Sequence, residues 1–102
     1  MKEISKKTQN TAMSILSDTR QNMREYGTDW TWASFGIARY SRNCIKDMRR
    51  FFEEKQSRNE WAIRYDERHG KTATDRQLEE REALNICIKT MDNWLKVKEV
   101  SY

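Results

Sequence analysis

The sequence predicts an all-α protein of three helices that form a single domain, residues 1–102. The chain has no proline and only three glycines, so the residues that interrupt helices and shape tight turns are nearly missing. Apolar residues recur at intervals of three and four along most of the chain, which is the spacing of one helix face. Four tryptophans and three phenylalanines supply large apolar surfaces, so we expect a packed core although 35% of the residues are charged.

The first helix is expected over residues 3–26. Its apolar and small residues advance by three or four positions at each step, as a buried helix face requires. Gly27 follows where a left-handed residue would end the helix, and Thr28 or Asp29 can cap the start of the next one. The predicted buried stripe comprises Ile4, Thr8, Ala12, Ile15, Thr19, Met23 and Tyr26.

The second helix is expected over residues 29–69, which gives a length of roughly 60 Å at 1.5 Å per residue. Two positions weaken it, namely Gly36 and the polar segment 55–60, where a bend or a break is possible. Gly70 then ends the helix. The predicted stripe comprises Trp30, Ala33, Ile37, Ser41, Cys44, Met48, Phe51, Lys55, Ala62, Tyr65 and His69, with Tyr40, Ile45, Phe52 and Ile63 beside it.

The third helix is expected to begin at Thr72 or Thr74 and to reach about residue 98. Thr74 is followed three positions later by Gln77, which is the spacing of a capping box. Acidic residues follow in the first turns and lysines near the end, as the helix dipole favours. The predicted stripe comprises Ala83, Leu84, Cys87, Ile88, Met91, Trp94, Leu95 and Lys98.

Short connections between helices make them antiparallel neighbours. The long central helix is therefore expected to lie between two antiparallel partners, as elongated helical hairpins or a three-helix bundle. On this geometry Leu84 lies near Glu60, and Trp94 lies near Arg50. The central helix is longer than either partner, so part of its stripe stays uncovered, and we expect a homodimer that buries it.

Hydropathy and cysteine usage indicate a cytoplasmic protein. No apolar run approaches the ~18 residues of a membrane span, and residues 1–7 lack the apolar stretch of a signal peptide. Cys44 and Cys87 are far apart and show no metal-ligand spacing, so we interpret them as reduced thiols packed as small apolar groups.

One face of the central helix combines aromatic and basic residues. It lies opposite the predicted stripe, and five basic residues fall within positions 39–50 against one acidic residue. Further along, the same face carries Trp61, Arg64 and Arg68. The candidate partner-binding residues are Trp32, Phe35, Arg39, Arg42, Lys46, Arg49 and Arg50.

This face allows more than one interpretation. Cations can follow a phosphate backbone while aromatic rings stack on bases, but arginine and tryptophan are also typical of protein–protein hot spots. The alternative is a solvated face, with Trp32 and Phe35 packed on another helix or a second subunit. A helix-turn-helix is disfavoured, because Gly36 comes three residues after Ala33 rather than about four.

The sequence predicts no enzyme, cofactor or metal site. The single histidine, His69, stands at a helix end, where it stabilises the helix dipole. No Gly-rich phosphate loop and no zinc-ligand spacing occurs.

We therefore expect a non-catalytic helical interaction protein that modulates a protein or a protein–nucleic-acid complex by occupancy, inhibiting or recruiting it. A phage-type inhibitor of host machinery and a small accessory subunit both fit this description. Two alternatives stay open, namely direct nucleic-acid binding through the basic-aromatic face and a structural self-assembling protein.

Overall fold

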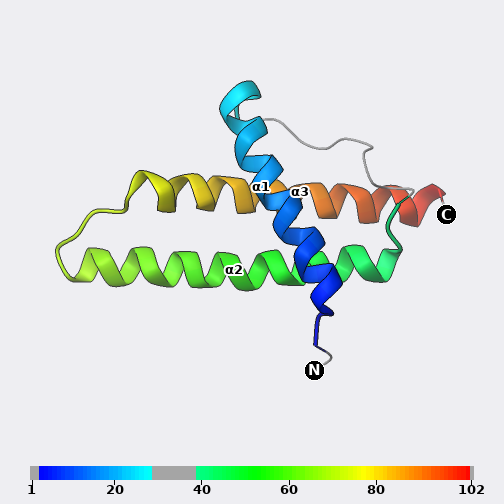
Figure 1. Ribbon diagram of the computed structural model, residues 1–102, viewed down its shortest axis with the longest axis horizontal. Coiled ribbons are helices and arrows are strands. Elements are labelled where there is room, and N and C mark those ends of the chain that lie inside the picture. The colour runs from blue at the N-terminus through cyan, green and yellow to red at the C-terminus, as the bar shows by residue number, and fades with distance from the viewer. Residues whose placement is uncertain (1–2, 29–38, 102) are drawn as a thin grey trace.

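The computed structural model describes residues 3–28 and 39–101, with side chains as far as Lys98. These residues form three helices and contain no strand: α1 (Lys6–Tyr26), α2 (Arg42–Arg68) and α3 (Asp75–Ser101). The all-α prediction is confirmed. Figure 1 shows α2 and α3 as an antiparallel hairpin joined by a short turn, with α1 crossing them. None of these helices has the length and apolar character needed to cross a membrane.

The end of each helix has a local chemical cause. The hydroxyls of Ser5 and Ser41 accept hydrogen bonds from the backbone N–H groups of Thr8 (3.2 Å) and Cys44 (3.1 Å), which caps α1 and α2. The predicted capping box of α3 is confirmed. Gln77 N–H donates to the Thr74 hydroxyl (3.1 Å), and Thr74 N–H donates to the Gln77 side-chain oxygen (2.9 Å).

The predicted start of the central helix is wrong. Ser41 caps α2, and the residues before it form a bend and a turn, so no helix runs unbroken from residue 29. α2 therefore has 27 residues and is about 40 Å long rather than 60 Å. Of the predicted second-helix stripe, Trp30, Ala33 and Ile37 lie outside the described residues.

α2 and α3 pack in nearly the register that the sequence predicts. Pairs across the hairpin include Glu60 with Arg81 (4.0 Å) and Gln56 with Asn85 (2.5 Å). The expected neighbour of Glu60 was Leu84, which lies three residues, or about one helical turn, from the observed neighbour Arg81. No break occurs at residues 55–60, where the side chains of Gln56 and Asn59 each donate a hydrogen bond to α3.

The buried stripe of α2 is rotated from the predicted one. Ile45, Met48, Phe52, Asn59 and Ile63 are buried, whereas Tyr65 and His69, which were assigned to the stripe, are exposed. The prediction failed here because it assigned large apolar residues such as Tyr65 to the buried side. In the structure, α3 covers the side of α2 that carries Asn59 and Ile63. In the stripe predicted for α3, Ala83, Leu84, Cys87, Met91 and Trp94 are buried, whereas Ile88 is half-buried.

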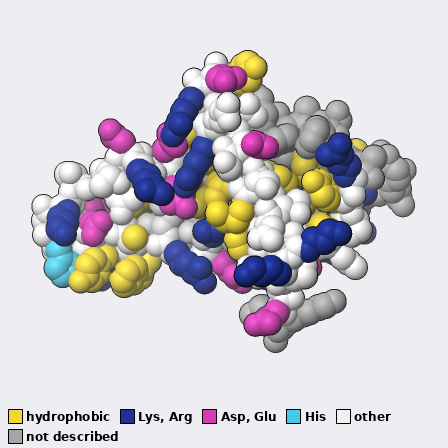
Figure 2. All heavy atoms as spheres, in the orientation of Figure 1, with side chains coloured by type: hydrophobic (Ala, Val, Ile, Leu, Met, Phe, Trp, Pro, Cys, Tyr) yellow, Lys and Arg dark blue, Asp and Glu magenta, His cyan; other side chains and the backbone are white. Residues whose placement is uncertain are grey.

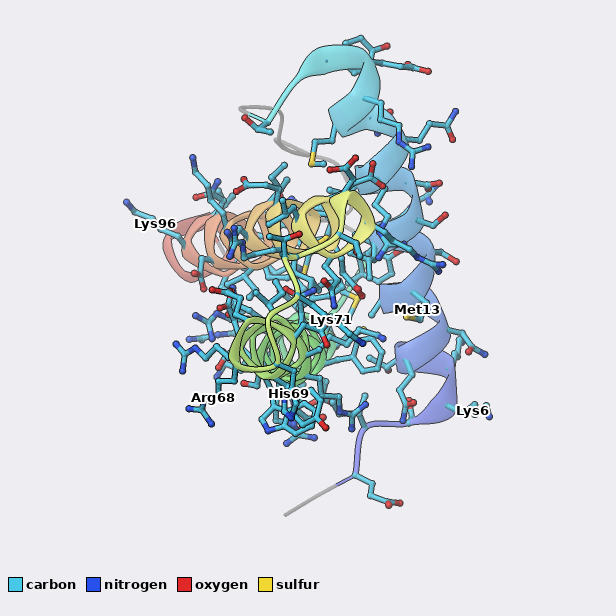
Figure 3. The ribbon with its side chains drawn as sticks, turned by 90° about the vertical axis from the view of Figure 1, so that its left-hand side faces the viewer. Lys6, Met13, Arg68, His69, Lys71 and Lys96 are labelled. Carbon is cyan, nitrogen blue, oxygen red and sulfur yellow. The ribbon has the colours of Figure 1, made fainter. Side chains whose placement is uncertain are left out.

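α1 packs on one side of the hairpin (Figures 1 and 3). We expected it to lie antiparallel along α2 because the connection was taken to be short. α1 instead crosses α2 and α3 (Figure 1). The shared core contains Ala12, Ile15 and Leu16 of α1, Ile45, Met48 and Phe52 of α2, and Ala83, Leu84, Cys87, Met91 and Trp94 of α3.

Ion pairs join the C-terminal half of α1 to the start of α3. Arg20 lies 3.3 Å from Glu80, and Arg24 lies 2.8 Å from Glu79. The hydrogen bond from the Arg24 guanidinium holds the pKa of the Glu79 carboxyl below its ordinary value. The end of the hairpin around Gly70 lies to one side of α1 and extends beyond it (Figure 1).

Candidate interaction face

The binding residues predicted from the sequence do not share one surface in the structure. Trp32 and Phe35 lie outside the described residues. Arg39 is in the turn before α2. Arg42 and Lys46 are exposed and one helical turn apart on α2.

Arg49 and Arg50 point to different neighbours. The Arg49 guanidinium donates to Asp92 of α3 (Nε–Oδ1 2.5 Å) and also pairs with Glu53. Its charge is thus compensated within the chain. Arg50 instead lines a cavity of about 460 Å³ together with Ile4, which precedes α1, and with other residues of α1 and α2. Among the described residues, the exposed basic pair at the start of α2 is therefore Arg42 and Lys46.

A second group of aromatic side chains lies near the C-terminal end of α2. Trp61 is 67% exposed and Tyr65 is 48% exposed, which is unusual for rings of this size on a charged helix. The rings of Trp61 and Tyr65 stack with centroids 5.2 Å apart, and those of Tyr65 and His69 with centroids 4.2 Å apart. The three rings, which follow one another at intervals of four residues, form what we call the aromatic ladder.

A hydrogen bond fixes the last ring of the aromatic ladder. His69 Nδ1 lies 2.8 Å from the backbone carbonyl oxygen of Tyr65. Since a carbonyl oxygen only accepts, the Nδ1 atom carries the proton and donates it. Figure 3 shows His69 and Arg68 on the side of α2 that faces away from α3. The aromatic ladder is therefore an ordered surface feature.

Two arginines lie beside the aromatic ladder. Arg64 and Arg68 are exposed, and neither makes an ion pair with any residue in the ranges 3–28 and 39–98. Arg20, Arg24, Arg49 and Arg81 by contrast all pair with carboxylates. The guanidinium groups of Arg64 and Arg68 are thus available to a partner.

The aromatic and basic side chains border an open groove of about 630 Å³ on the outer side of α2. Ser57, Gln56 and Glu60 also line this groove. We call this surface the distal face of α2. Figure 2 shows hydrophobic side chains next to His69 at the left-hand end of the molecule. The lining residues are Gln56, Ser57, Glu60, Trp61, Arg64, Tyr65 and Arg68.

Sequence reasoning found this face only in part. It placed Trp61, Arg64 and Arg68 on the solvent side of the helix but committed to none of them, and it assigned Tyr65 and His69 to the core. The interval of four residues from Trp61 to Tyr65 to His69 was the available signal, because such positions share one helix face. Asn59 and Ile63 occupy the buried side, two residues before Trp61 and Tyr65.

The described residues give little basis for metal or thiol chemistry. They contain no group of three or more His, Cys, Asp or Glu side chains that could hold a metal ion. Cys87 is buried, and this burial raises the pKa of its thiol to about 12. The distal face therefore offers contact surface, stacked rings and guanidinium donors.

Comparisons of the chain with protein-family models, with curated proteins and with solved structures found no match.

Proposed function

We propose that this protein is a non-catalytic interaction protein, which modulates a protein or a protein–nucleic-acid complex by occupying one of its surfaces. The observation that carries the proposal is the aromatic ladder, with Trp61 and Tyr65 exposed beside Arg64 and Arg68. Tryptophan, tyrosine and arginine are enriched among the few residues that carry most of the binding energy at protein interfaces. Large exposed rings are otherwise unfavourable in water, which supports a partner that covers them.

The distal face also lies in a suitable place for binding. It occupies the end of the hairpin that extends beyond α1, so no other helix of the described residues limits access to it (Figure 1). Its rings are held in a stack before any partner arrives. Pre-organised side chains lose little conformational entropy on binding, which favours affinity.

The test compares two double variants of the full chain in affinity capture from cell lysate, with and without nuclease. Trp61→Ala with Tyr65→Ala removes the two large rings of the distal face. Met13→Ala with Val97→Ala is the matched control, because both residues are exposed apolar residues elsewhere on the molecule. A partner that resists nuclease, binds the control and is lost with the ring variant supports the proposal. A partner retained by the ring variant contradicts it.

Direct nucleic-acid binding is the second candidate, supported by the exposed pair Arg42 and Lys46 next to Arg39. It predicts an affinity that decreases linearly with salt on logarithmic axes, because each phosphate contact releases counterions. Exchange of Arg39, Arg42 and Lys46 for glutamate should abolish such binding while circular dichroism shows unchanged helicity. Binding that survives this exchange would contradict the second candidate.

A further inference from the structure

We infer that the distal face of α2 receives an acidic amphipathic helix of a partner protein. The inference rests on the proposed function and specifies the chemistry of the partner. It depends on the juxtaposition of the aromatic ladder with two arginines that have no ion pair among the described residues. The groove that Trp61, Tyr65 and the two arginines line would hold one row of apolar side chains of the partner.

The spacing of the aromatic ladder does not admit nucleotide bases between its rings. A base inserted between two rings needs about 6.8 Å between them, twice the ~3.4 Å rise per nucleotide. The ring centroids are only 5.2 Å and 4.2 Å apart. Bases could enter the aromatic ladder only by breaking contacts that already exist. The rings therefore present their edges as a continuous apolar ridge.

The charges on the groove also favour a protein over a phosphate backbone. Glu60 also lines the groove, so a continuous row of phosphates would meet a carboxylate there. Glu60 is 4.0 Å from Arg81 of α3, so it belongs to the hairpin contact. The arginines are placed to pair with separate carboxylates, which guanidinium groups bind through two parallel hydrogen bonds.

The repeat along the face matches a helix. Arg64 and Arg68 are four residues apart, as are Trp61 and Tyr65, which corresponds to roughly 6 Å along the axis. On a partner helix, two carboxylates four residues apart have the same separation. Two apolar side chains four residues apart on an adjacent stripe of that helix have it too. A helix laid along α2 can thus satisfy the basic row and the apolar ridge together.

The test uses the full chain, labelled with ¹⁵N, and three defined probes in NMR titrations. One probe is a synthetic helix of about 18 residues with a leucine stripe flanked by glutamates. The second is the same helix with lysine in place of glutamate. The third is oligothymidylate of about 20 nucleotides. The expected result is saturable binding of the acidic helix, with shift changes confined to residues 56–69, including the Trp61 indole.

A charge reversal sharpens the test. The double variant Arg64→Glu, Arg68→Glu should lower the affinity for the acidic helix about tenfold or more. The same variant should bind the lysine helix. The matched control is Lys7→Glu with Lys89→Glu, which changes the net charge equally at exposed positions of α1 and α3. This control should bind the acidic helix within about twofold of the wild type. Circular dichroism of both variants confirms that the fold is kept.

Three outcomes would overturn the inference. The first is shift changes at residues 56–69 with oligothymidylate but not with the acidic helix. The second is equal weakening by the charge reversal and its control. The third is a self-association, detected by sedimentation, that is lost with Trp61→Ala and Tyr65→Ala and so identifies a second copy as the occupant. Affinity capture that depends on the rings, combined with failure of the acidic helix, would refute this inference and leave the proposed function standing.

Discussion

The Cys87 thiol of α3 donates a hydrogen bond to the Thr19 hydroxyl oxygen of α1, 3.5 Å away, inside the core. Thr19 in turn donates to the backbone carbonyl oxygen of Ile15 (2.7 Å). Both side chains are fully buried. A polar contact thus joins α1 to α3 at the point where their apolar faces meet, next to the ion pair of Arg20 with Glu80.

Replacement of Thr19 by valine should reduce the free energy of unfolding by about 1 kcal/mol. Valine has nearly the same shape, so it keeps the packing but removes the hydrogen bonds to Ile15 and Cys87. Urea unfolding followed by circular dichroism measures the change. An unchanged midpoint would show that the buried hydroxyl contributes nothing.

The same replacement at Thr90 should have the opposite effect. Thr90 is also buried, but its hydroxyl has no hydrogen-bond partner within the described part of the chain. A buried hydroxyl without a partner is unfavourable, so Thr90→Val should raise the free energy of unfolding by about 1 kcal/mol. Because the two variants differ only in the bonding of the hydroxyl they remove, each serves as the control for the other.

Titration of Cys87 should make the fold less stable in alkali. Its thiol pKa is 9.0 in the reference state and about 12 in the fold. Above pH 9 the unfolded chain therefore releases the proton while the folded chain keeps it, so the free energy of unfolding falls as the pH rises from about 9 to about 12. Urea midpoints at pH 8, 9 and 10 should decline more steeply for the wild type than for Cys87→Ala. Equal slopes would contradict the assignment.

Ser41→Ala should destabilise the fold by about 1 kcal/mol, because it removes the side-chain oxygen that caps α2. Ser57→Ala is the matched control, since Ser57 is exposed in the middle of the same helix and should change stability little. Thermal or urea unfolding compares the two. Equal effects would mean that Ser41 does not begin the helix.

The start of α2 shows why part of the fold could not be predicted. As a small residue, Ser41 can lie in the buried stripe of a helix, but it can equally well cap the N-terminus of one. The neighbouring residues form no pattern that distinguishes these two roles. The capping box of Thr74 and Gln77 was predicted correctly, because two residues at a fixed interval specify each other. The all-α class required only composition and periodicity.

The distal face was harder to predict because burial depends on the partner helix. Tyr65 is large and apolar, and the sequence alone favours it over Asn59 as a core residue. Asn59 nevertheless faces α3 and donates to the backbone oxygen of Gln77 (3.2 Å), which satisfies its amide nitrogen. Only the relative rotation of α2 and α3 reveals that Tyr65 lies outside the core.

The geometry of the hairpin also determines how the protein is best immobilised for binding measurements. The turn around Gly70 and the last residue of α3 lie at opposite ends of the long axis, in a molecule 50 Å in its longest dimension (Figure 1). A biotin or carrier attached after Ser101 would therefore hold the turn outward from a sensor surface. Attachment through a cysteine introduced at Lys71 would press Trp61 and Tyr65 against that surface, so the two orientations should differ in apparent capacity for any ligand of the distal face.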